Sequence, residues 1–199
     1  GALPPNFSGL PLLEDGMMAD IETASSIPAD QFWPGVGEIR RADGRSLAMI
    51  GSREGERFLF TVPFDQHDAG RSTSKRPRQT NDCTVRALAS AAGAEYDRVY
   101  DTLAAAGRKG ARGFDIRTWA KRAEFNGYRF AWLGFPAVKG MWRVNPVLFA
   151  LKFPEGRFIL RTAKHVIACV DGRISDTTNA IEGRCVYGAL ALIPTAKEN

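Results

Sequence analysis

The sequence predicts an α+β fold in which helices come first and an antiparallel sheet follows. Apolar residues recur at helical spacing between about residues 81 and 125, and short apolar runs separated by turn signals come after them. The apolar content of 44% and the charged content of 25% are typical of a globular chain and exclude disorder throughout. A length of 199 residues fits one domain with a small appendage.

Charge divides the chain into two parts. Residues 1–70 carry a net charge of −6 and residues 71–199 a net charge of +11. The composition of each part predicts four segments: an extended N-terminal arm over 1–34, a small β unit over 35–65, a basic linker over 66–80 and the main domain over 81–199. Asp-Gly and Glu-Gly turns between short apolar runs indicate the β unit.

Helices open the main domain. Asn81 or Asp82 can cap a first helix that stops at Gly93. A second helix is expected over 95–106 and a third over 115–125.

Strands dominate the rest of the main domain. Asn145-Pro146 is a capping residue followed by a first-turn proline, which predicts a short helix through Lys152. Asp171-Gly172 predicts a hairpin turn. Strands are expected over 128–133, 157–161, 165–170, 173–177 and 184–193.

Cys83 is the candidate nucleophile. It falls in the first turn of the first predicted helix, where free backbone N–H groups and the helix dipole favour a thiolate. Four cations upstream would strengthen this effect if they fold nearby: Arg71, Lys75, Arg76 and Arg78. A free cysteine is also often a small buried apolar residue, so that interpretation stays open.

His165 is the candidate base. If the Asp171-Gly172 turn contains two residues, Ile167 faces Asp176, and His165 lies diagonally from Asp176 on the same sheet face. A nucleophile, a base and an orienting carboxylate form the general triad arrangement. Asn179 and Asp171 are alternative third members, and a histidine that merely ends a strand is the alternative for His165.

Other polar residues have simpler interpretations. Gln79 or Asn81 could donate to an oxyanion hole beside the Cys83 N–H, whereas Asp82 is expected to cap the helix. Cys169 and Cys185 fall in apolar strand runs and are expected in the core, and His67 in a loop. These scattered residues have no metal-ligand spacing, and no phosphate-binding glycine loop is present, so we expect neither a metal nor a cofactor.

Composition also bears on location and partners. Three cysteines with no CxxC pair indicate reduced thiols. No apolar run approaches the roughly 20 residues of a membrane span, and no secretory signal is visible. The basic clusters at 71–78 and 108–112 allow nucleic-acid binding, although aromatic residues are not interleaved with them.

Three segments carry a resemblance to a known family: 79–88 (QTNDCTVRAL), 156–160 (GRFIL) and 165–176 (HVIACVDGRISD). Together they resemble the papain-like cysteine peptidases. Within these they are most similar to the double-glycine-type peptidases and to small cysteine-peptidase-like proteins of tailed bacteriophages. The similarity covers about residues 76–193. It implies a papain-like fold, with Cys83 as nucleophile, His165 as base, Asp176 as the orienting acid and Gln79 as oxyanion donor.

The function that this resemblance implies is thiol-dependent hydrolysis of an amide bond, in a polypeptide or in peptidoglycan. It places the protein in the cytoplasm of a host cell or in a virion. Two other classes stay open. One is a virion adaptor that keeps the fold without turnover and docks other virion proteins through the arm 1–34. The other is a nucleic-acid-binding module that uses the basic half.

Overall fold

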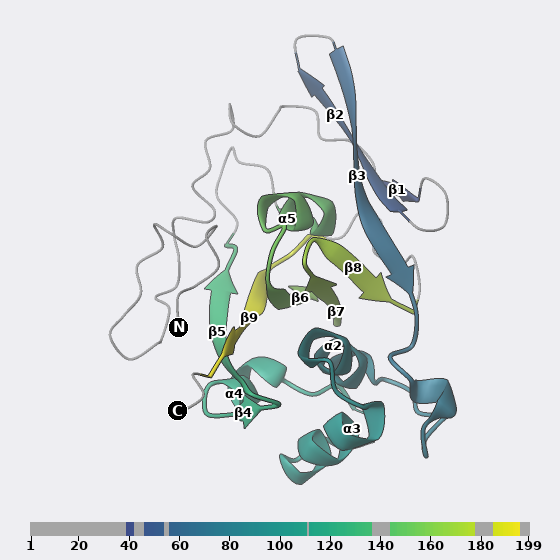
Figure 1. Ribbon diagram of the computed structural model, residues 1–199, viewed down its shortest axis with the longest axis vertical. Helices are drawn as coiled ribbons and strands as arrows, with labels where there is room; N and C mark the ends of the chain where they lie inside the picture. Colours follow the sequence, from purple (N-terminus) through teal and green to yellow (C-terminus); the bar gives the residue numbers. More distant parts are fainter. Residues whose placement is uncertain are drawn as a thin grey trace.

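The computed structural model describes residues 39–41, 46–53, 56–110, 112–136, 144–177 and 185–195, with side chains from Val62 onward. The expected arm over 1–34 and Asn179 lie outside the described residues. The described chain contains helices and one open sheet, so the α+β prediction is confirmed (Figure 1). Within these residues, no helix has both the length and the apolar content to cross a membrane.

The elements alternate along the chain more than the sequence predicts. The helices are η2 (Arg71–Thr73, a 3-10 turn), α2 (Cys83–Ala92), α3 (Tyr96–Ala105), α4 (Ile116–Ala120) and α5 (Pro146–Lys152). The strands are β1 (Ile39–Arg41), β2 (Ser46–Arg53), β3 (Glu56–Gln66), β4 (Glu124–Phe125), β5 (Tyr128–Gly134), β6 (Arg157–Thr162), β7 (His165–Val170), β8 (Arg173–Asp176) and β9 (Gly188–Pro194).

The sheet has the strand order β1-β2-β3-β8-β7-β6-β9-β5-β4. All neighbouring strands are antiparallel except β3 and β8, which pair in parallel, Phe64 with Ile174 and Gln66 with Asp176. The expectation of a purely antiparallel sheet is therefore wrong at this one pairing. The physical reason for this parallel pairing is that β3, which is also paired with β2, meets a strand more than a hundred residues later in the chain. Such a contact has no local signal in the sequence.

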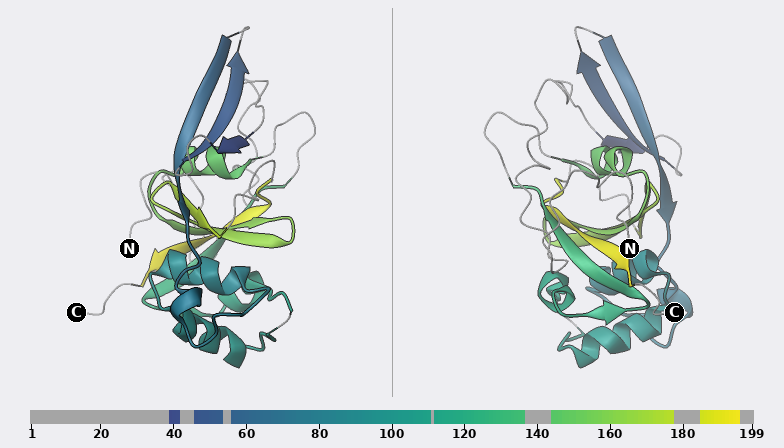
Figure 2. Two further views of the ribbon diagram at one scale, coloured as in Figure 1. Left: turned by 90° about the vertical axis from the view of Figure 1, so that its right-hand side faces the viewer. Right: turned by 60° about the vertical axis from the view of Figure 1, so that its left-hand side comes forward.

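Helices cover both faces of the sheet (Figures 1 and 2). Alternate residues of β6 point to opposite faces, so Phe158 and Leu160 pack with α5 while Ile159 packs with α2 and α3. The rings of Phe149 on α5 and Phe158 lie edge to face, with centroids 5.1 Å apart. Because both faces are buried, the central strands are continuous apolar runs, as in β9.

The helix boundaries follow the expected signals in two cases. Gly93 ends α2 in the left-handed conformation, with φ 63°. The Asn145 side chain accepts a hydrogen bond from the Leu148 N–H at the start of α5, beside Pro146.

The third predicted helix is too long. The chain leaves α4 after Ala120, and Glu124–Phe125 forms β4 instead. The reason is the turn at Asn126-Gly127, where both residues have positive φ (50° and 79°), as a type I′ hairpin requires. This turn pairs Phe125 with Tyr128 and buries the Phe125 ring.

Gly188 on β9 has no room for a side chain. A Cβ there would lie 2.1 Å from Cζ2 of Trp132 and 2.8 Å from the Leu133 carbonyl oxygen. Gly188→Ala is therefore expected to displace the Trp132 ring and to lower the free energy of unfolding by about 1–3 kcal/mol. Urea unfolding followed by tryptophan fluorescence measures both effects.

Gly113→Ala is the matched control for this prediction. Nothing lies within 4 Å of a Cβ at Gly113, and the φ of that residue is not positive. Equal stability of the two variants would contradict the packing role of Gly188.

Candidate active site

Cys83 is the first residue of α2, as the sequence predicts. Asp82 occupies the N-cap position, so the cysteine stands where the helix presents free backbone N–H groups. The thiol is half-buried, and it interacts with the His165 ring and the Val166 N–H of β7. Helix α2 packs directly on β7, which brings these distant segments together.

His165 and Asp176 are joined by the predicted hairpin. Val170 pairs with Arg173 and Ala168 with Ser175, around a turn in which Asp171 and Gly172 both have positive φ. The expected two-residue turn and its register are therefore confirmed. The His165 Nε2 and the Asp176 Oδ2 lie 2.5 Å apart. With Nε2 on the carboxylate, Nδ1 is the ring nitrogen left to face the thiol.

Cys83, His165 and Asp176 stabilise one another in their charged forms. Burial by itself would lower the pKa of His165, but hydrogen bonds and negative charge from Asp176 and Cys83 raise it to about 9 from 6.5. Burial by itself would raise the pKa of the Cys83 thiol, but the His165 ring and the Val166 N–H bring it below its ordinary value. The site therefore favours a thiolate beside an imidazolium.

Asp176 is buried and fully hydrogen-bonded. Its Oδ1 accepts from the Arg86 guanidinium at 2.8 Å and from the Thr177 N–H at 2.7 Å, while Oδ2 faces His165. Burial by itself would raise the pKa of this carboxyl, but His165, the Thr177 N–H and Arg86 together lower it. The carboxylate is therefore held ionised and fixed in one orientation toward the imidazole.

Arg86 links this carboxylate to a second one. Its Nε donates to Asp82 Oδ1 at 3.0 Å, and its Nη1 donates to Asp176 Oδ1 and to Thr177 Oγ1. The side chains of both aspartates are only 2% exposed. One arginine on α2 thus ties the helix that carries Cys83 to the strand that carries Asp176.

The expected capping role of Asp82 is wrong. Its side chain makes no hydrogen bond to a helix N–H. Its oxygens instead accept from Arg86, from the Tyr96 hydroxyl at 2.8 Å and from Arg71 at 3.4 Å. Three donors, on α2, α3 and η2, orient the carboxylate toward themselves instead of toward the first N–H groups of the helix.

Gln79 and Asn81 do not reach the cleft as oxyanion donors. The Gln79 Nε2 donates to the carbonyl oxygens of Thr80 and Gly110, and neither Gln79 nor Asn81 lines the cleft. Asn81 has a positive φ of 52°, and its carbonyl accepts from Arg108. With Gln79 and Asn81 turned elsewhere, the Cys83 backbone N–H at the start of α2 is the remaining candidate for the oxyanion donor.

Cys169, Cys185 and His67 do not line the cleft. Cys169 is fully buried, and burial raises the pKa of its thiol to about 12. The expectation that Cys185 is a core strand residue is wrong, because it precedes β9 and is half-buried. His67 follows β3 in a loop, as expected, and its Nδ1 accepts from the Ala69 N–H.

Two of the three arginines shortly before Cys83 have acidic partners. Arg71 contacts Asp82, and Arg76 donates to Asp97 at 2.6 Å and to Asp101 at 2.7 Å. Arg108 is buried over the Tyr100 ring. These three cations therefore brace the protein around the start of α2. The other cations of the two basic clusters, Lys75, Arg78, Lys109 and Arg112, are exposed, so nucleic-acid binding stays an untested prediction.

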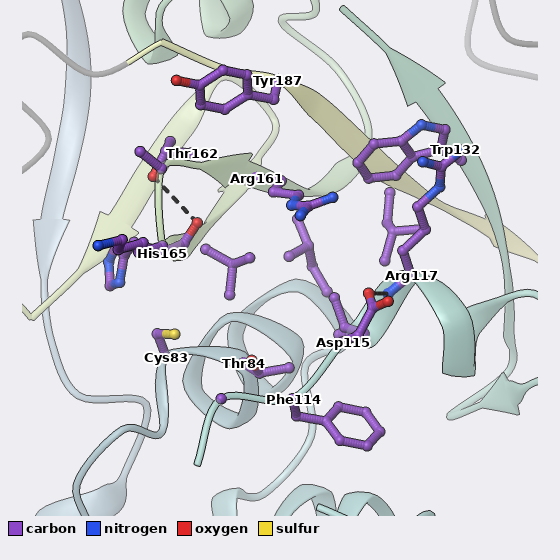
Figure 3. A pocket seen from close by; sticks show the side chains of 17 residues that line it. Cys83, Thr84, Phe114, Asp115, Arg117, Trp132, Arg161, Thr162, His165 and Tyr187 are labelled. Carbon is purple, nitrogen blue, oxygen red and sulfur yellow. Dashed lines mark hydrogen bonds between the residues drawn. The ribbon is translucent and has the colours of Figure 1, made fainter.

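A cleft of about 740 Å³ opens from Cys83 and His165 (Figure 3). Helix α4 and the segment before it form one wall, and β6, β7 and β9 form another. In Figure 3 the Cys83–His165 pair lies at one end and the Trp132 ring toward the other. An extended chain could therefore lie across the pair.

Two functional contacts were not predicted from the sequence. Arg86 and Thr177 both hydrogen-bond Asp176, and nothing local to Thr177 indicates this. The spacing of Asp82 and Arg86, four residues apart on one helix, is a signal that could have pointed to their ion pair.

Among the described residues, no group of three or more His, Cys, Asp or Glu side chains is placed to hold a metal ion. Comparison with known proteins adds no assignment: no family model, curated protein or solved structure matches this chain.

Proposed function

We propose that this protein is a cysteine hydrolase of the papain-like type that cleaves amide bonds in polypeptides. The observation that carries the proposal is the chain of contacts from Cys83 to His165 to Asp176 at one end of an open cleft. These are the nucleophile, base and orienting acid of triad chemistry. Their order along the chain also agrees with the resemblance to papain-like cysteine peptidases.

The reaction would run in two steps. The Cys83 thiolate attacks the carbonyl carbon, and the negative charge that develops on the oxygen faces the N-terminus of α2. The His165 imidazolium then donates its proton to the leaving amine, and a thioester remains on Cys83. Water, deprotonated by His165, hydrolyses the thioester and restores the thiol. Because the pKa of His165 is about 9, the imidazolium persists at neutral pH.

Alkylation by iodoacetamide tests the reactive pair without a known substrate. At about pH 6, where an ordinary thiol is protonated, Cys83 is expected to react fast and Cys169 to stay unlabelled. In His165→Ala the thiol loses its hydrogen bond and the neighbouring positive charge, so the rate at this pH should fall about tenfold or more. Mass spectrometry of the labelled peptides gives the rate at each cysteine.

His67→Ala is the matched control, because it removes the other histidine of the chain. It should leave the Cys83 rate unchanged. Labelling of Cys83 that is as slow as that of Cys169 and indifferent to His165 would refute the hydrolase and favour the adaptor interpretation.

A further inference from the structure

The cleft carries an excess of positive charge that the proposed chemistry does not use. Among the described residues, three cationic side chains line it, Arg117, Arg161 and Lys164, against one carboxylate, Asp115. We propose, on the basis of the proposed hydrolase function, that the substrate is an acidic polypeptide and that Arg161 and Lys164 bind a carboxylate of an Asp or Glu side chain close to the cleaved bond.

Arg161 is placed to meet such a side chain. It is an exposed residue of β6, and in the view of Figure 3 its guanidinium lies between the Cys83–His165 pair and Trp132. Among the described residues, no side chain hydrogen-bonds this guanidinium, and Asp115 is a carboxylate on which its charge acts from farther away. A guanidinium presents a planar fork of N–H donors that matches a carboxylate.

Lys164 adds a second charge at the reactive end. It is in the two-residue connection between β6 and β7, directly before His165, and its side chain is exposed. No ion pair to Lys164 is formed within the described part of the chain. A carboxylate that enters beside His165 would thus meet two cations from one hairpin, Arg161 and Lys164.

Asp115, the one carboxylate that the described part of the cleft contains, is hydrogen-bonded to α4. Asp115 accepts from the Arg117 N–H at 3.1 Å and from the Thr118 hydroxyl at 2.8 Å. The Arg117 guanidinium lies 4.4 Å from the centre of the Trp132 ring, against the far wall. Asp115 makes no hydrogen bond to Arg161 or Lys164, although the charge of Arg161 helps to lower the pKa of its carboxyl. One carboxylate offsets only one of the three cations, so the described lining of the cleft keeps a net positive charge.

A random peptide mixture, digested and read by mass spectrometry, tests the substrate class. Wild type should enrich Asp or Glu at one position near the cleaved bond. Replacing that Glu by Gln should lower kcat/KM about tenfold or more, as expected for loss of a charge-assisted hydrogen bond. The double variant Arg161→Glu/Lys164→Glu should reverse the preference to Lys or Arg at that position.

The matched control is Lys121→Glu/Arg129→Glu, which changes net charge equally at two exposed residues outside the cleft. It should keep the acidic preference. If wild type cleaves peptides without an acidic preference, or the control reverses it as well, the inference is overturned while the hydrolase function stands.

Binding to the Cys83→Ala variant provides a test that needs no turnover. Fluorescence polarisation compares a labelled peptide of alternating Glu and Gly with its Gln–Gly counterpart. The Glu peptide should bind about tenfold tighter, and added salt or the Arg161→Glu/Lys164→Glu change should remove the difference. Preferential binding of the Glu peptide without any cleavage by wild type would support the binding site for acidic side chains and refute the hydrolase function. Equal binding of both peptides would refute the acidic site.

Discussion

Cys83→Ala is expected to lower the rate of peptide hydrolysis about 10⁴-fold or more, because no other group on the cleft can form the thioester. The fold should survive, since the thiol is only half-buried and alanine is tolerated in the first turn of a helix. Hydrolysis of a peptide that wild type cleaves, measured in excess enzyme, gives the rate, and circular dichroism confirms the fold.

Cys185→Ala is the matched control for this loss. It makes the same change at another half-buried cysteine, one that does not line the cleft, and should retain full activity. Hydrolysis by Cys83→Ala that equals that of wild type would show that the nucleophile is not this thiol.

Arg86→Met is expected to lower the free energy of unfolding by about 3–5 kcal/mol, because it leaves two buried carboxylates without their shared cation. Asp82 would keep Tyr96 and a longer contact with Arg71, and Asp176 would keep His165 and the Thr177 N–H. Methionine preserves the volume of the side chain, so the loss reports the charge and its hydrogen bonds. Urea unfolding at neutral pH measures it.

Arg173→Met makes the same substitution in an exposed ion pair. Arg173 donates to Asp65 at 3.0 Å, with both side chains about half exposed, so the loss should stay below about 1 kcal/mol. An Arg86→Met variant that is no less stable than Arg173→Met would refute the bridging role. Arg86→Lys should fall between the two, since a single ammonium keeps the charge without the fork.

The sequence predicted the reactive hairpin because its geometry is local. A two-residue turn at Asp171-Gly172 sets the register of β7 and β8, and the register places His165 diagonally from Asp176 on the same sheet face. The start of α2 at Cys83 follows in the same way from the polar residues before it and the apolar spacing after it.

The predictions that were wrong involve contacts between distant parts of the chain, or a turn signal that was overlooked. Asp82 has the composition of a cap, but residues on three elements compete for its carboxylate. The β3–β8 pairing joins segments that no periodicity relates. The short strand β4, by contrast, was indicated by Asn126-Gly127, which the apolar pattern of the predicted helix masked. The papain-like assignment stays a proposal.

The parallel pairing of β3 with β8 also decides where the protein can be divided. Gln66 pairs with Asp176, and the His67 N–H donates to the Asp176 carbonyl, so the acidic N-terminal half holds the main chain of the residue that orients His165. A fragment that starts after residue 70 would turn β8 into an open edge strand beside the reactive pair. The boundary between the acidic part, residues 1–70, and the basic part, residues 71–199, is therefore not a place where the chain can be cut into two independent domains.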